Sequence, residues 1–299
     1  MPPSKPKPSE IAAEAKKTYI PYIRQTLSDK WPPTSFLCYS ESMLASPSSE
    51  TRQVHFAFYE RDPVDLALEW APTENKPIPV IMPANDKRAG GVMSPEECLC
   101  RRSNLFATLT TPAAGNPASS NYPIPSKAGI FSETVVVFRN GPDKYESWQE
   151  YKALPIISVC PVRRPKLDNS GKKYSFKQEK ELMRDKIRTA LRIAVYYNYS
   201  NICIGSFGLG PNFRNPTEEI ALMWRDAFLK DPEFQNHFED VVFAFENPEG
   251  PGAASSSSKS SSSKSSSSKS STSSKSAAVS DLEIFKHVFK PMNIHGAFK

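Results

Sequence analysis

The chain has 299 residues, of which 38% are hydrophobic and 11% aromatic, values typical of one large globular domain or two small ones. It contains no apolar run long enough for a transmembrane helix, and its N-terminus lacks the apolar stretch of a secretory signal, so we expect an intracellular protein, nuclear or cytoplasmic. The formal net charge is +6, and subtracting the four lysines of a Ser/Lys tract leaves +2. Charge therefore gives no reason to expect nucleic acid as a direct substrate.

The cysteine and histidine positions do not form a metal motif. Five cysteines and four histidines are scattered along the chain, and no histidine lies at ligand spacing. Cys98 and Cys100 are two residues apart, which on a helix directs them to different faces. An odd number of cysteines argues against a disulfide framework. We expect buried free thiols, no metal and no cofactor.

The N-terminal region predicts a disordered start followed by a helix. Residues 1–8 are rich in Pro and Lys, a composition typical of disorder. Ser9 is a good N-cap, and Ile11 and Ala15 recur on one face of a helix that should run toward Leu27.

Short apolar runs typical of β-strands then alternate with amphipathic helices. Strands are expected at Val54–Tyr59, Ile78–Met82, Thr134–Phe138, Leu154–Val159, Ile202–Ile204 and Val241–Phe245, and the main helices at Gln178–Asn198 and Pro216–Leu229. Strands that are apolar along their whole length indicate a sheet covered on both faces. The predicted fold is therefore α/β, a three-layer α/β/α sandwich with a mostly parallel or mixed central sheet.

A Ser/Lys tract over residues 253–278 interrupts this pattern and cannot bury apolar surface. Ser280 and Glu283 then form a capping-box pattern before an apolar helical stripe, so a last helix should pack back on the domain. We expect a disordered segment 1–8, one domain over 9–252, a flexible insertion over 253–278 and a returning helical segment over 279–299.

Deletion of Ser255–Lys275 is expected to leave thermal stability and ligand affinity nearly unchanged, because the tract should lie outside the core. Thermal melts and ligand titrations of the shortened chain test this expectation. A large loss of either property would mean that the tract is ordered against the domain.

Ligands of open α/β sheets bind beyond the carboxyl ends of the strands, so the loops there are the first candidates. Ile202–Ile204 runs into a glycine-rich loop at 205–210, and the next helix should be capped by Asn215 with Pro216 at its first position. Such a loop lets backbone N–H groups approach a diphosphate, and a plain strand-to-helix turn is an equal alternative. A bulky residue at Gly208 should block this approach without unfolding the domain.

A second candidate follows the strand near Met82. Two glycines, Gly90 and Gly91, precede two adjacent acids, Glu96 and Glu97. A carboxyl group beside a sugar can protonate a leaving group or orient water. An ordinary helix start with acids in its first turn explains the same residues, and on their own they favour that explanation.

A third candidate is Phe245, at the end of the last apolar strand. Its ring could stack on an adenosine, although such a residue more often belongs to the core.

Taken in order, these segments resemble the microbial-type poly(ADP-ribose) glycohydrolases, a branch of the macrodomain superfamily. The string Glu96–Leu105 is very similar to the Glu-Glu-x-Leu-Cys-Arg-Arg-Ser helix of that family. Residues 122–125, 129–132, 135–139, 282–285 and 288–289 also look like family segments in the same order. The resemblance implies a macrodomain-like fold and a glycohydrolase that removes ADP-ribose from poly- or mono-ADP-ribosylated protein, without metal, through an oxocarbenium-like transition state.

The same resemblance implies a role for each matching residue. Asn85, Gly90 and Gly91 would hold the distal ribose, Glu97 would be catalytic with Glu96 assisting through ribose hydroxyls, Gly205, Ser206, Phe207, Gly208, Leu209 and Gly210 would cradle the diphosphate, Phe213 would pack on the distal ribose, and Phe245 would lie by the adenosine.

The sequence departs from the family pattern beside the acids. Ala89 stands where the family has a first glycine, the connection to the acids is short, and Pro95 replaces a glutamine. A module that binds ADP-ribose without cleaving it is therefore the alternative function, and a scaffold using the Ser/Lys tract is a weaker one. The expected partner is ADP-ribose or ADP-ribosylated protein, with no membrane, for a monomeric chain.

Overall fold

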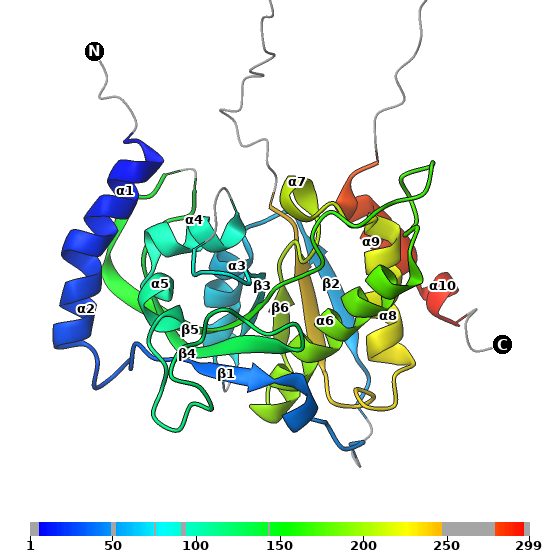
Figure 1. Ribbon diagram of the computed structural model, residues 1–299, viewed down its shortest axis with the longest axis horizontal. Helices are drawn as coiled ribbons and strands as arrows, with labels where there is room; N and C mark the ends of the chain where they lie inside the picture. Colours follow the sequence, from blue (N-terminus) through cyan, green and yellow to red (C-terminus); the bar gives the residue numbers. More distant parts are fainter. Residues whose placement is uncertain are drawn as a thin grey trace, which may run out of the picture.

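The computed structural model describes residues 6–48, 52–74, 76–90, 94–142, 144–246 and 279–295. Its centre is a seven-stranded sheet in the order β1-β4-β5-β3-β6-β7-β2 (Figure 1). The strands are β1 (Phe36–Tyr39), β2 (His55–Tyr59), β3 (Val80–Pro83), β4 (Ala128–Arg139), β5 (Ser147–Val159), β6 (Ile202–Ile204) and β7 (Asp240–Ala244). From β5 to β2 the neighbours are parallel, whereas β4 pairs antiparallel with both β1 and β5, so the sheet is mixed as predicted.

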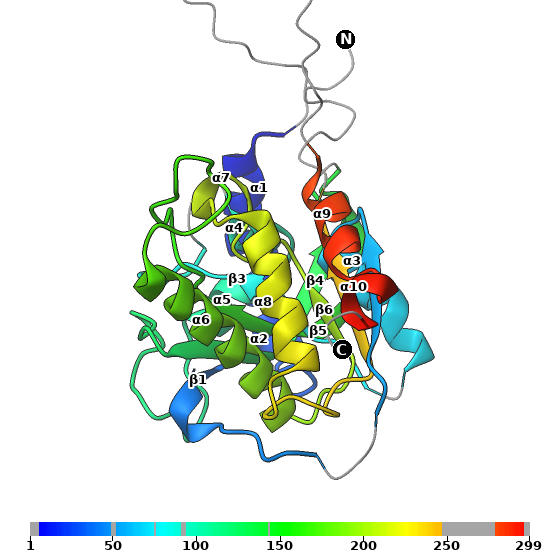
Figure 2. The ribbon, with the colours of Figure 1, turned by 90° about the vertical axis from the view of Figure 1, so that its right-hand side faces the viewer.

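Helices cover both faces of the sheet (Figures 1 and 2). They are α1 (Pro8–Glu14), α2 (Ile20–Thr26), α3 (Pro63–Trp70), α4 (Pro95–Arg102), α5 (Leu105–Leu109), α6 (Lys177–Tyr196), α7 (Gly210–Phe213), α8 (Thr217–Leu229), α9 (Asp281–Val288) and α10 (Pro291–His295), with short helical turns at Ala15–Tyr19, Ser40–Ser42 and Ala71–Thr73. One apolar cluster joins the sheet to α6, α8 and α9, and another joins it to α3, α4 and α5. The architecture is the predicted three-layer α/β/α sandwich.

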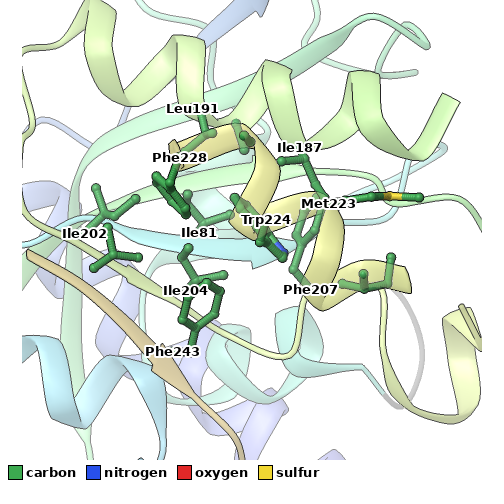
Figure 3. Packing of buried hydrophobic residues seen from close by; sticks show 14 of the residues in the cluster. Ile81, Ile187, Leu191, Ile202, Ile204, Phe207, Met223, Trp224, Phe228 and Phe243 are labelled. Atoms are coloured by element: carbon green, nitrogen blue, oxygen red, sulfur yellow. The ribbon is translucent and has the colours of Figure 1, made fainter. Parts of the chain in front are cut away.

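Alternate residues of the central strands supply the two clusters. Ile81 of β3 faces the α6 and α8 side, while its neighbours Val80 and Met82 face α3 and α5. Figure 3 shows Trp224 of α8 among the apolar side chains of β6, β7 and the loop after β6. Its ring centroid lies 5.7 Å from that of Phe207, which is buried. Each large aliphatic or aromatic side chain buried in this way contributes about 1.5–3 kcal/mol.

The N-terminal helix has a break that the sequence pattern did not predict. Residues Ala15–Tyr19 form a π-helical turn between α1 and α2, just before Pro21. Proline lacks a backbone N–H and clashes in an α-helix interior, and a wider turn accommodates it. Tyr19 stacks on Phe138 of β4 with ring centroids 4.6 Å apart, which fixes this helix on the end of the sheet.

Two predicted helix starts are wrong by one or two residues. The first helix is capped at Lys7 rather than Ser9, with Pro8 at its first position. Pro216, and not Asn215, is the N-cap of α8. The Asn215 side chain instead donates to the Val162 and Gly208 carbonyls, both at 2.8 Å, so it ties two loops together.

The end of the chain returns to the sheet. Ser280 caps α9 by accepting a hydrogen bond from the Glu283 N–H at 3.3 Å. Phe285 of α9 is buried against Phe243 of β7, with ring centroids 5.2 Å apart. The predicted Ser/Lys insertion at 253–278 lies outside the described residues. None of the described helices is long and apolar enough to cross a membrane.

Candidate active site

Loops from three neighbouring parallel strands meet at one edge of the sheet. β5, β3 and β6 are hydrogen-bonded neighbours, and the segments after them form a cavity of about 380 Å³. Its walls are Pro83, Ala84, Asn85, Ser94, Arg163, Arg164, Asn212 and Phe213. This volume falls within the range of small-molecule sites, and the position is the one that the topology of α/β sheets favours.

A larger cavity, of about 550 Å³, lies at the opposite edge, where Ile78, Asn201 and Glu239 precede their strands. Size alone would select that cavity. The 380 Å³ cavity is nevertheless the better candidate, because open α/β sheets bind ligands beyond the carboxyl ends of their strands.

Asn85 and Gly90 form the turn that follows β3. The Asn85 side-chain oxygen accepts a hydrogen bond from the Lys87 N–H at 2.9 Å, which closes the turn. Gly90 has φ +88°, a left-handed conformation that favours glycine. A Cβ there would lie in ordinary van der Waals contact with the Phe106 ring, 3.6 Å away, so the backbone conformation rather than lack of space favours glycine. Gly91, predicted with these residues, lies outside the described part of the chain.

The two acids begin α4 as predicted but lie in different environments. Ser94 caps the helix by accepting from the Glu97 N–H at 3.2 Å, and Pro95 takes its first position. Consecutive helical residues point about 100° apart. Glu96 is completely buried, whereas the Glu97 side chain keeps 29% of its exposure.

The buried Glu96 carboxyl holds α4 to the turn after β3. Its Oε2 accepts a hydrogen bond from the Asn85 N–H at 3.3 Å, and its Oε1 has no partner among the described residues. Burial raises the pKa of Glu96 to about 8, although hydrogen bonds from the N–H groups of Asn85 and Gly90 oppose the rise. In this structure Glu96 contacts the turn rather than a cavity wall.

The Glu97 carboxylate faces outward and is paired with a cation. It lies 2.6 Å from the Arg101 guanidinium one helical turn later, and it lines a second cavity together with Gly90. Of the two acids, Glu97 is therefore the one that a ligand can reach.

The environment of Glu96 gives a testable pH dependence. Its folded-state pKa lies above the ordinary value of 4.5, so its contribution to stability is fully present below that value and is lost as pH rises toward about 8. Glu96→Gln keeps the shape and removes the proton equilibrium. Urea unfolding at pH 5 and pH 8 should show the wild type losing more stability than the variant across this interval. Parallel losses in the two proteins would rule out the raised pKa.

The glycine-rich loop after β6 lies beside this edge. Within the described part of the chain, the N–H groups of Ser206 and Gly208 donate to no protein acceptor, whereas those of Phe207 and Leu209 bond to Gly205 and Ser206 carbonyls. The loop enters the one-turn helix α7, which begins at Gly210, and not directly the longer helix that the sequence predicted. The side chains of Phe207 and Leu209 belong to the core.

A bulky residue at Gly208 would strain the backbone as well as fill the loop, so loss of binding in such a variant has to be read beside a thermal melt. Gly208 has φ +81°, and an added Cβ would lie 2.8 Å from Cε of Met183, a buried core residue. Any side chain there requires the end of Met183 to shift and strains the left-handed backbone.

Phe213 lies on the wall of the 380 Å³ cavity. Arg163, which the sequence analysis did not single out, lies over its ring. The Arg163 guanidinium is 5.6 Å from the Phe213 ring centroid, and the Arg164 N–H donates to the Phe213 carbonyl at 2.6 Å. Two adjacent arginines shortly after the end of β5 were the available sequence signal. They place positive charge where a diphosphate could bind.

Phe245 does not line this cavity. Its ring is 7% exposed and packs edge to face on Phe285 of α9, with centroids 4.9 Å apart. The position by an adenosine thus stays a prediction. The described residues contain no cluster of three or more His, Cys, Asp or Glu side chains that could hold a metal ion.

Comparison with known proteins gives a family match and a set of similar folds. Residues 10–140 match the model of the microbial-type PARG catalytic domain, where PARG stands for poly(ADP-ribose) glycohydrolase. This segment, somewhat less than half of the chain, contains Asn85, Gly90 and both acids. No curated protein is significantly similar in sequence.

The fold is similar to that of solved bacterial glycohydrolases. The Deinococcus radiodurans PARG in complex with ADP-ribose has a TM-score of 0.62 and 18% identity, over 94% of this chain and 98% of that one. A variant of the Thermomonospora curvata enzyme has a TM-score of 0.61 and 18% identity, over 81% and 94%. Residues 10–140 of this chain are thus similar to the microbial-type PARG catalytic domain, and the chain as a whole has the same α/β fold as these solved glycohydrolases.

Proposed function

We propose that this protein binds ADP-ribose and acts as a glycohydrolase on ADP-ribosylated protein or its polymers. The observation that carries the proposal is the pair of carboxyl groups at the start of α4, beside a cavity with two arginines. The family match includes this pair, and the Deinococcus radiodurans enzyme was solved with ADP-ribose.

In this proposal the 380 Å³ cavity receives the ADP-ribose. Arg163 and the N–H groups of Ser206 and Gly208 would bind the diphosphate, with α7 beginning next to it. Asn85 and Phe213 would contact the distal ribose. Backbone donors and a planar guanidinium suit phosphate oxygens, which carry charge in both ground and transition states.

Glu97 is the proposed catalytic residue, and Glu96 positions the turn that presents the ribose. Hydrolysis breaks the bond from the anomeric carbon to the leaving oxygen, adds the hydroxyl of water to that carbon and moves a proton to the leaving oxygen. Glu97 can relay this proton because its carboxylate is accessible and Arg101 fixes its orientation. Glu96 is buried and bonded to the Asn85 backbone, so it acts through the turn.

Calorimetric titration with ADP-ribose, followed by a release assay on ADP-ribosylated protein, tests the function. Binding together with release of ADP-ribose supports the glycohydrolase. Binding without release supports the binding module instead, and absence of binding contradicts both.

A further inference from the structure

A second cavity, of about 530 Å³, lies between the N-terminal helix and the Asn85–Gly90 turn. Lys16 comes from the π-helical turn of the N-terminal helix, and Lys87 and Arg88 come from the turn after β3. Glu97 of α4 and Phe106 of α5 complete this part of the wall. Figure 1 shows this end of the molecule, where α1 and α2 lie beside α4 and α5.

The walls of this cavity carry an excess of positive charge. Lys16, Lys87 and Arg88 are exposed, and none of them forms an ion pair with another described residue. The other charged pair on the wall, Arg101 with Glu97, has no net charge. Three cations around one cavity repel one another when the cavity is empty. A bound anion relieves this repulsion, so the cavity attracts anions.

The same cavity has an aromatic wall. The Lys16 ammonium lies 5.1 Å from the Phe106 ring centroid, and Tyr122 is a second aromatic residue of the lining. Cations beside aromatic surface suit a phosphorylated ribose or nucleotide better than a simple inorganic ion.

The 530 Å³ cavity lies next to the proposed catalytic residue Glu97 and to the 380 Å³ cavity, on the side where a leaving group would be. Asn85 and Ser94 line the 380 Å³ cavity, whereas Gly90 and Glu97 line this one, so one turn separates the two. A group that gives a proton to the leaving oxygen lies on the side of the leaving portion. ADP-ribose held in the first cavity would therefore direct the leaving portion into the second.

We propose that the 530 Å³ cavity is a leaving-group subsite that binds the phosphate-bearing next unit of an ADP-ribose polymer. This inference rests on the proposed function. It gives the N-terminal helix a part in substrate binding through Lys16, and it assigns the charges of Lys87 and Arg88 to the polymer rather than to the ADP-ribose that is released.

Lys16→Gln and Arg88→Gln, singly and together, test the subsite, with Lys17→Gln as the matched control. Lys17 is the exposed neighbour of Lys16 in the same helical turn and does not line the cavity. The measurement is the ratio of kcat/KM for poly(ADP-ribose) to kcat/KM for protein carrying a single ADP-ribose. We expect the double variant to lower this ratio about tenfold, equivalent to about 1.4 kcal/mol, and Lys17→Gln to leave it unchanged.

Three results would overturn the inference. The first is an unchanged ratio in the double variant, and the second is an equal fall in the Lys17→Gln control. The third is a selective loss of activity on single-unit substrates with an acidic sequence around the linkage, which would assign the cavity to the protein acceptor. Titration with free ADP-ribose keeps the two proposals apart: wild-type binding with an unchanged ratio contradicts the subsite alone, and no wild-type binding contradicts the function itself.

Discussion

Glu97→Gln is expected to lower turnover of an ADP-ribosylated substrate by roughly a hundredfold or more, while affinity for ADP-ribose largely survives. The amide keeps the size of the side chain and can still hydrogen-bond, but it cannot relay a proton. Loss of the ion pair with Arg101 should cost at most about 1 kcal/mol of stability, because the pair is partly exposed. Single-turnover release of ADP-ribose, measured beside calorimetric affinity, separates the chemical step from binding.

Glu96→Gln is the control for this experiment. Its side chain contacts the turn and no cavity, so its loss should be milder and should affect affinity as well as turnover. The reverse order, with Glu96→Gln the more damaging to turnover alone, would transfer the proton relay to Glu96. If both variants changed turnover equally and only slightly, the two acids would serve only to stabilise the N-terminus of α4.

Gly210→Asp should weaken ADP-ribose binding about tenfold or more, since it adds a negative charge at the end of the loop 205–210, the proposed diphosphate site. Gly210 has φ +74°, and no heavy atom lies within 4 Å of the place that a Cβ would take, so a side chain there has space. Asp is one of the residues that tolerate this left-handed conformation. Isothermal titration gives the affinity, and a thermal melt confirms that the domain is folded.

Gly171→Asp is a closely matched control for that variant. Gly171 has φ +69° and equally open surroundings, and it lies in a turn closed by Asp168 that does not line the cavity. Both variants thus carry the same backbone strain and the same charge. A similar loss of affinity in both would argue against a diphosphate at 205–210.

The parts of the candidate site that depend only on residues close together in the sequence were predicted correctly. Ser94, Pro95 and the acids specify the start of α4 through capping and helix polarity, which depend on neighbouring residues only. The strand Ile202–Ile204 was predicted with its observed ends, because it is short, apolar and followed by glycine. The family resemblance then gave the order of these pieces along the chain.

Features that depend on tertiary contacts were missed. β1 has only four residues and is defined by its antiparallel pairing with β4. The outer half of β5 alternates exposed polar residues, so only its buried end looked like a strand. Arg163 became a site residue because β5 lies next to β3, and strand order cannot be read from hydrophobic periodicity.

The different burial of Glu96 and Glu97 has the same origin. The sequence shows two adjacent acids, and helical geometry says only that they point in different directions. Which of them is enclosed depends on how the Asn85–Gly90 turn packs against α4. This tertiary contact buries Glu96 and leaves Glu97 accessible.

The packing of Phe207 on Trp224 links the glycine-rich loop 205–210 to a natural optical probe. Trp224 is 1% exposed, whereas the other three tryptophans, Trp31, Trp70 and Trp148, are half-buried and distant in sequence from the loop. Its emission should therefore be blue-shifted and resistant to quenching by acrylamide or iodide. Occupancy of the neighbouring loop could then be followed in unlabelled protein, in real time, from the short-wavelength edge of the fluorescence spectrum.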